Sequence, residues 1–177
     1  MADYFSPTVI QPTIPAADIT PLERLLLSHI FQVEPDGDGL YFYANETPAD
    51  LIWLDRLPLQ TALAQSKNTA GTTAVTVVTE QLAQLPDDNV EIELDFSDRS
   101  WESIFQDIVR RSPKLRYVTA ESAFTCSKMR PDGFGGMAVV ITASAIIGKS
   151  TGEIIADYLH DAVPGWDQPS ATPATAA

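Results

Sequence analysis

The stretch VEIELDFSDRSWESIFQDIVRRSP, residues 90–113, decides the fold class. Its first part, residues 90–96, alternates apolar and acidic residues, which predicts a strand with one buried face and one face in water. In residues 101–109 the apolar side chains recur at three- and four-residue spacing, which predicts a helix that buries one stripe. Two arginines and a proline close this helix, as expected at the negative end of the helix dipole. Strand and helix therefore belong to one α+β unit.

Upstream of this stretch, Thr20, Pro21 and Glu23 mark the start of another helix. A threonine at the cap, a proline at the first helical position and a glutamate at the third form a capping box. The apolar residues that follow, as far as Phe31, lie on one side of the expected helix.

The two ends of the chain differ in composition from its middle. Residues 1–18 contain three prolines and no periodic apolar pattern, so we expect an extended N-terminal arm. Residues 164–177 are rich in Pro, Ala and Thr, which predicts a disordered tail. Residues 19–163 are expected to form a single α+β domain.

The order of the predicted elements is α-β-β-α-α-β-α-β-β-α. It predicts a mixed or largely antiparallel sheet of about five strands, with helices packed mainly on one face. Residues 72–78 are β-branched and remain open between helix and strand. The expected segments are helices at 20–31, 57–66, 72–85, 101–111 and from 150 onward, and strands at 40–44, 51–54, 90–96, 115–127 and 137–147, with 51–54 as the hairpin partner of 40–44.

Charge is sorted along the sequence. The net charge is −13, but residues 1–98 account for −13, residues 99–149 for +4 and residues 150–177 for −4. An acidic region repels nucleic acid and anionic membranes at long range, while the central segment could attract a phosphate group locally. Acidic charge that only keeps the protein in solution is the simpler alternative.

Cysteine use and hydropathy indicate the compartment. The single cysteine, Cys126, permits no intramolecular disulfide and no multi-thiolate zinc site. No secretory pattern opens the chain and no apolar run is long enough to span a membrane. We therefore expect a cytoplasmic protein that has no membrane contact.

Three patterns suggest catalysis or cofactor binding, and each has a simpler explanation. Residues 143–151 resemble a phosphate-binding loop with alanine in place of the first glycine, yet residues 144–147 inside it bring β-branched bulk where such a loop needs glycine-like freedom. Residues 36–39 resemble a calcium loop, but the later ligand positions do not match. Cys126 lies on a predicted core face, and neither His29 nor His160 has an evident orienting partner. The sequence therefore favours a non-enzyme without a cofactor or a metal.

A basic cluster is the strongest candidate site. Six of the 11 basic residues fall within 21 positions of an otherwise acidic chain. They could bind a phosphate, a nucleic-acid backbone or an acidic protein, or they could cap a helix and pair with the domain's own carboxylates. The residues of this candidate anion-binding cluster are Arg110, Arg111, Lys114, Arg116, Lys128 and Arg130.

The chain also resembles a group of known sequences. The stretches that carry the likeness are SWE at 100–102, DIVRRS at 107–112, LRYV at 115–118, AFTCSKMRPDGFGG at 123–136, TPLE at 20–23 and DGDGLYF at 36–42. Together they resemble uncharacterised accessory proteins carried on bacterial conjugative plasmids and integrative elements. The resemblance implies a bacterial cytoplasm and a link to maintenance or transfer of such an element, but no activity and no site residue.

Three functional hypotheses remain. The first is a non-enzymatic interaction or regulatory protein that presents acidic charge to a basic protein partner. The second is binding of nucleic acid or a phosphorylated ligand through the cluster in residues 110–130. The third is a small hydrolase or transferase whose site no linear motif reveals. Neither the partner nor the oligomeric state follows from the sequence.

Overall fold

The computed structural model describes residues 2–66, 71–86, 89–97 and 100–165. Within these ranges it contains five α-helices, an eight-stranded sheet and a separate two-stranded ribbon. The first elements are β1 (Tyr4–Phe5), β2 (Thr8–Gln11), β3 (Ile14–Pro15), α1 (Pro21–Ile30), β4 (Gln32–Asp36), β5 (Gly39–Ala44), β6 (Leu51–Asp55) and α2 (Arg56–Gln65). They are followed by α3 (Thr73–Leu82), β7 (Glu91–Asp95), α4 (Trp101–Arg111), β8 (Tyr117–Cys126), β9 (Gly135–Thr142), β10 (Ile146–Ser150) and α5 (Thr151–Ala162).

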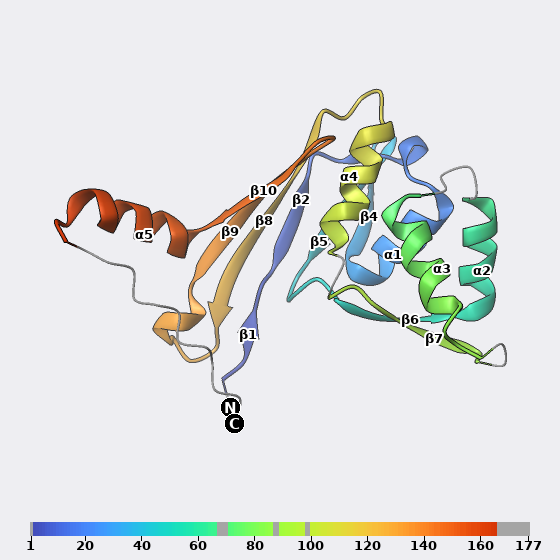
Figure 1. Ribbon diagram of the computed structural model, residues 1–177, viewed down its shortest axis with the longest axis horizontal. Helices are drawn as coiled ribbons and strands as arrows, with labels where there is room; N and C mark the ends of the chain where they lie inside the picture. Colours follow the sequence, from blue (N-terminus) through green and yellow to red (C-terminus); the bar gives the residue numbers. More distant parts are fainter. Residues whose placement is uncertain (1, 67–70, 87–88, 98–99, 166–177) are drawn as a thin grey trace.

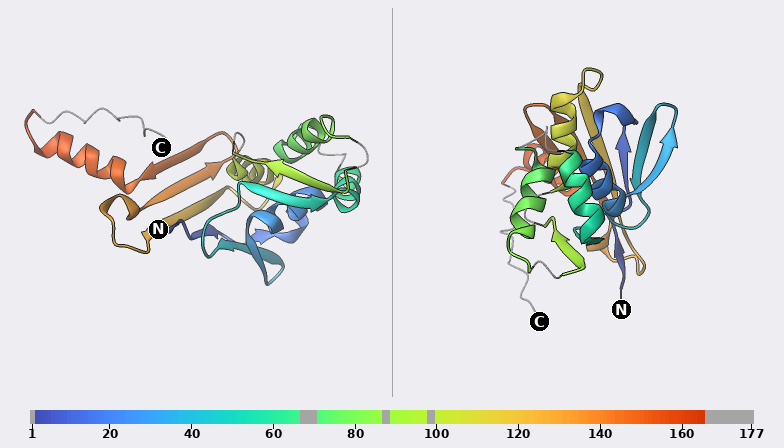
Figure 2. Two further views of the ribbon diagram at one scale, coloured as in Figure 1. Left: turned by 90° about the horizontal axis from the view of Figure 1, so that it is seen from below. Right: turned by 90° about the vertical axis from the view of Figure 1, so that its right-hand side faces the viewer.

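The large sheet is antiparallel at every described pairing. Its strand order is β10-β9-β8-β2-β5-β3, while β1 pairs with β8 and β4 pairs with β5. Helices α1 to α4 gather on one side of this sheet, with the β6–β7 ribbon next to them (Figures 1 and 2). The far parts of β8, β9 and β10 extend away from this helical layer, and α5 follows the far end of β10 (Figure 1).

The α+β class expected from the sequence is confirmed, but the count of about five strands is wrong. Strands β1 to β3 lie in the segment expected to be an extended arm, and β4 lies partly in an expected turn. These strands are short or rich in proline, so they show no clear period of two. The segment 137–147 is two strands instead of one, because a turn separates β9 from β10.

The expected hairpin between 40–44 and 51–54 is also wrong. Strand β5 pairs with β2, β3 and β4, whereas β6 pairs with β7, so that Trp53 faces Glu93. Both β6 and β7 bury every second residue, so their apolar faces match when the two strands pair, although they lie far apart in the sequence. Residues 72–78, left open by the sequence, belong to helix α3 from Thr73 onward.

The tail expected at 164–177 lies outside the described residues from 166 onward. The arm expected at 1–18 is extended and joins the large sheet through β1, β2 and β3.

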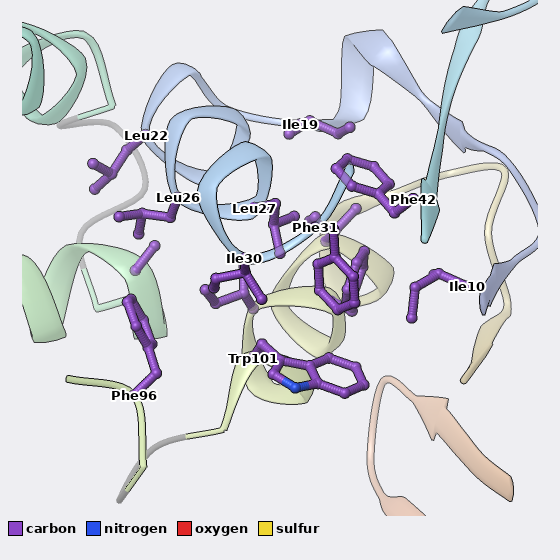
Figure 3. Close-up of a cluster of buried hydrophobic side chains, with 14 of the residues drawn as sticks. Ile10, Ile19, Leu22, Leu26, Leu27, Ile30, Phe31, Phe42, Phe96 and Trp101 are labelled. Carbon is purple, nitrogen blue, oxygen red and sulfur yellow. The ribbon is translucent and has the colours of Figure 1, made fainter. Parts of the chain in front are cut away.

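An aromatic cluster joins the helices to the large sheet. Phe31, at the end of α1, contacts the rings of Phe42 on β5 and Trp101 on α4 edge-on, with centroid distances of 6.4 and 5.1 Å. Phe105 completes the group at 5.6 Å from Phe42. Figure 3 shows these rings beside the buried leucines of α1. Edge-to-face geometry of this kind adds to the stabilisation gained from burial alone.

A buried ion pair joins α1 to α4 beside the core. Glu23 is fully buried, and its Oε2 accepts a hydrogen bond of 2.9 Å from the backbone N–H of Thr20, which completes the capping box. Nη2 of Arg111 donates to the same carboxylate at 2.6 and 2.9 Å. Next to it, the hydroxyl of Ser112 donates to Asp18 at 2.5 Å. Glu23 therefore serves as both a helix cap and the counter-charge for α4.

Replacing Glu23 by leucine should lower the free energy of unfolding by roughly 3–5 kcal/mol, because it removes the carboxylate that neutralises the largely buried guanidinium of Arg111. The double variant Glu23→Leu/Arg111→Met should recover most of this loss, except for about 1 kcal/mol from the lost cap. Urea denaturation followed by circular dichroism measures both values.

Lys114→Met is the matched control, because Lys114 pairs with Asp38 at 3.5 Å on the exposed surface. It should change the stability by less than about 1 kcal/mol. Equal losses for Glu23→Leu and Lys114→Met would contradict a special role for the buried pair.

Candidate protein-interaction face

The outer face of the β6–β7 ribbon combines exposed apolar side chains with carboxylates. Alternation along each strand sends one set of side chains into the core and the other set outward. The inner set packs against the helices, whereas Trp53 and Leu51 in the outer set are 52% and 46% exposed. We call the outer set the acidic ribbon face, and its members are Leu51, Trp53, Asp55, Glu91, Glu93 and Asp95.

The strand register places the carboxylates around Trp53. Glu93 lies directly opposite Trp53, and Asp55 is its neighbour on the same face of β6. Asp55 in turn lies directly opposite Glu91, so two like charges face each other across the ribbon. Such a cross-strand pair destabilises a sheet, whereas an opposite charge at either position would stabilise it. The face thus concentrates negative charge at a cost in stability.

Among the described residues, no cation pairs with the carboxylates at the centre of this face. Within the described residues, the side chains of Asp55, Glu91 and Glu93 take part in no ion pair and no hydrogen bond. Asp95 differs, because its carboxylate accepts hydrogen bonds from the hydroxyl and, at 2.8 Å, from the backbone N–H of Ser97. These two hydrogen bonds hold the pKa of Asp95 below its ordinary value.

Hollows flank the acidic ribbon face on two sides. Toward α3, a hollow of about 470 Å³ is bordered by Glu93 and Asp95 and by the polar side chain of Gln84. At the start of α2, another of about 550 Å³ is lined by Leu57 and Val90, whose side chains are 74% and 76% exposed. A bound segment could therefore extend beyond Trp53 in either direction and cover further apolar surface.

The six basic residues that the sequence suggests as an anion site fall into two groups in the structure, and the first group is paired with carboxylates. Arg110 donates to Asp107 at 3.0 Å, to the side chain of Gln106 at 2.7 Å and to the carbonyl of Ala143 at 2.8 Å. Arg111 is held by Glu23, and Lys114 lies 3.5 Å from Asp38. These three cations are paired with carboxylates of the same chain, and only the last pair is mainly in solvent.

The other three candidate cations lie at opposite ends of a long strand. Arg116 precedes β8, whereas Lys128 and Arg130 follow it, and the ten residues of β8 span about 33 Å. All three side chains are exposed and form no ion pair with a described residue. The six residues therefore do not form one surface, and their binding of an anion stays a prediction.

The remaining sequence candidates have structural roles or no partner. Cys126 is buried at the end of β8 against Gly133, and neither histidine hydrogen-bonds to it among the described residues. The string 143–151 forms a turn, strand β10 and the cap of α5 instead of a phosphate loop. In the part of the chain that the structure describes, no group of three or more potential ligands could hold a metal ion.

Sequence reasoning missed the acidic ribbon face and two other hollows. One, of about 770 Å³, lies between α1, α2 and β4 and has Arg24 among mainly apolar walls. Another, of about 630 Å³, lies on the side of the sheet that carries Tyr41 and Tyr43. The hydroxyl of Tyr43 donates to Glu34 at 2.7 Å, and this hydrogen bond raises the pKa of Tyr43. Acidic and aromatic side chains thus meet on a second face as well.

Comparison with protein-family models, with curated proteins and with solved structures finds no match to this chain. In the described ranges, each helix is too short or too polar to cross a membrane.

Ser97→Ala should raise the pKa of Asp95 toward the ordinary aspartate range, because it removes a hydrogen bond that favours the ionised form. That hydrogen bond stabilises the fold at pH values above the ordinary pKa of aspartate. This contribution is lost as the pH falls through the lowered pKa of Asp95. An NMR titration of the carboxyl carbon measures the shift. Ser97→Thr, which keeps the hydroxyl, should retain the low pKa, and an unchanged pKa in Ser97→Ala would contradict the assignment.

Proposed function

We propose that this chain is a non-enzymatic interaction protein that binds a basic segment of a protein partner through the acidic ribbon face. The observation that carries the proposal is the exposed indole of Trp53 among carboxylates that form no ion pair with any residue the structure describes. Large exposed aromatic side chains surrounded by one sign of charge are a chemical match for a segment of the opposite sign.

The chemistry of the face favours arginine in the partner. A guanidinium over the indole of Trp53 gains about 0.5–1 kcal/mol at an exposed site, and more when water is excluded. Its planar fork can at the same time donate two parallel hydrogen bonds to Glu93 or Asp55. A lysine offers only a point charge at the same place. We therefore expect arginine-rich segments to bind more tightly than lysine-rich segments of equal length.

The net charge supports rapid encounter with such a partner. A chain of net charge −13 attracts a basic surface at long range, and this attraction weakens as salt screens it. A basic surface that binds here is no longer available to phosphate groups. We propose that the chain regulates a protein with a nucleic-acid-binding surface in a bacterial cytoplasm, which agrees with the resemblance to accessory proteins of mobile elements.

The two alternative functions have less support. Binding of nucleic acid would use cations that the fold separates and of which three are already paired. A hydrolase or transferase would need a nucleophile and a base, and the described residues offer no interacting pair of this kind around Cys126 or the histidines.

The test is titration of a fluorescent oligo-arginine peptide into the full chain at about 50 mM and about 500 mM NaCl. We expect binding at low salt that weakens at least about tenfold at high salt. Glu93→Lys should weaken binding further than Trp53→Ala, because it adds repulsion to the loss of a carboxylate. An oligo-lysine peptide should bind less tightly than oligo-arginine.

Glu121→Lys is the matched control, since it makes the same change of charge at an exposed position of β8 outside the acidic ribbon face. Glu121 borders the hollow beside Tyr41 and Tyr43, so binding that falls equally in Glu93→Lys and Glu121→Lys would show attraction to net charge or to that second face, and either would contradict the proposed site. Absence of binding at low salt would contradict the function itself.

A further inference from the structure

Helix α5 is a well-capped helix that buries no residue fully. Ser150 and Glu153 form a complete capping box at its start, and the chain leaves the large sheet directly into it. None of its twelve residues is fully buried: Ile155 and Tyr158 are 57% and 68% exposed, and Ile154 and Leu159 are half-buried. It extends beyond the end of β10, on the side of the open edge of the sheet, away from all other helices (Figures 1 and 2).

A helix of this kind needs a partner. Isolated helices of about 12 residues are marginal in water, because packing of the apolar stripe supplies most of their stability. In α5 the apolar side chains of Ile154, Ile155, Tyr158 and Leu159 recur at helical spacing and form such a stripe. Within the described residues this stripe is only partly covered, because Ile155 and Tyr158 stay exposed.

The edge strand next to α5 is open as well. The N–H of Thr142 donates to the carbonyl of Ala145 at 2.8 Å across the turn from β9 to β10. Hydrogen-bonded pairs alternate along an antiparallel ladder, so Ile147 and Lys149 bond to β9, whereas the N–H and C=O of Gly148 point to the open edge. An edge of this kind is a template for one more antiparallel strand.

Strand β10 is suited to pair with a copy of itself. Gly148 is the central residue of its five, so a two-fold axis at Gly148 aligns two copies over their whole length. In that register the two glycines exchange both backbone hydrogen bonds, and the N–H of Ile146 meets the carbonyl of Ser150 in the other copy. The N–H of Ser150 is already used by Glu153 at 2.7 Å.

Charge favours a copy of this chain over a strongly charged partner at this end of the molecule. Of the 24 acidic side chains, 18 precede residue 117, and the segment 117–163 carries five acidic and three basic side chains. Lys149 and Asp157 also form an ion pair within the chain. Two such nearly neutral surfaces can approach each other without the repulsion expected from the total charge.

We propose that two copies of this chain form a symmetric dimer in which the β10 strands pair antiparallel about Gly148 and each α5 packs across the β9–β10 face of the other copy. The face offered to α5 includes Met137 and Ile146, each 39% exposed on the side of the sheet from which α5 leaves. The dimer pairs the open N–H groups of Ile146 and Gly148 and covers the apolar stripe in one step.

The available apolar area is sufficient for a stable interface. A tyrosine alone buries about 150–250 Å², and a stable interface needs roughly 800 Å² from each partner. Each copy contributes six partly or largely exposed apolar side chains together with the backbone of an edge strand. They are Met137, Ile146, Ile154, Ile155, Tyr158 and Leu159.

Sedimentation velocity of the full chain over a range of concentrations tests the proposal. We expect a dimer that dissociates on dilution. Ile155→Asp/Tyr158→Asp alters only exposed side chains and should raise the dissociation constant at least about 30-fold, the factor for loss of one strong hot-spot residue. Ile146→Pro removes an open-edge N–H and should weaken the dimer independently.

Leu57→Asp is the matched control, because this side chain is 74% exposed and lies on α2. It should leave the dimer unchanged, and far-UV circular dichroism checks that every variant keeps its fold. A monomer at all concentrations, a dimer unaffected by the α5 variant, or open-ended polymers instead of a closed pair would each overturn the proposal. The α5 and β10 variants lie away from the acidic ribbon face, so loss of the dimer and loss of peptide binding can be told apart.

Discussion

The carboxylate of Glu23 is the interaction on which the arrangement of the other elements depends. It closes the start of α1 and, from full burial, neutralises Arg111 at the end of α4. An uncompensated charge at this depth costs several kcal/mol, so α1 and α4 have one favourable relative position. Phe31 and Trp101 pack at that position, and the large sheet lies against the resulting layer. The ion pair thereby fixes which part of the sheet is covered by helices and which part extends beyond them.

Local signals in the sequence predict the helices and strands themselves better than they predict which of these elements lie side by side. The capping box at Thr20 and the helix from Trp101 could be predicted, because both depend on residues a few positions apart. The pairing of Trp53 with Glu93 could not, since 40 positions separate them and alternation fits several partners equally. Pairing of Arg111 with a carboxylate of the domain was one of the alternatives that the sequence offered, but its partner, the buried Glu23, could not be predicted, since 88 positions separate the two residues.

The candidate site could likewise be predicted only in its local features. The count of acidic residues predicts a charged exterior, but only the ribbon register brings Asp55, Glu91 and Glu93 together with an exposed tryptophan. Conversely, the basic residues that are close in sequence lie at two ends of β8 or are paired with carboxylates. The acidic ribbon face and α5 belong to different parts of the molecule. If both proposals hold, each copy presents one charged face and the dimer presents two.

The central claim is that the protein combines a closed core, fixed by Glu23 and Arg111, with an open edge that a second copy covers. Amide hydrogen exchange followed by mass spectrometry at low and high protein concentration tests it most directly, because it reports each element separately. We predict slow exchange in α1 and α4 at every concentration, and protection of β10 and α5 that rises with concentration. Equal protection of β10 and α5 at all concentrations, or exchange in α1 and α4 as fast as in α5, would contradict the account.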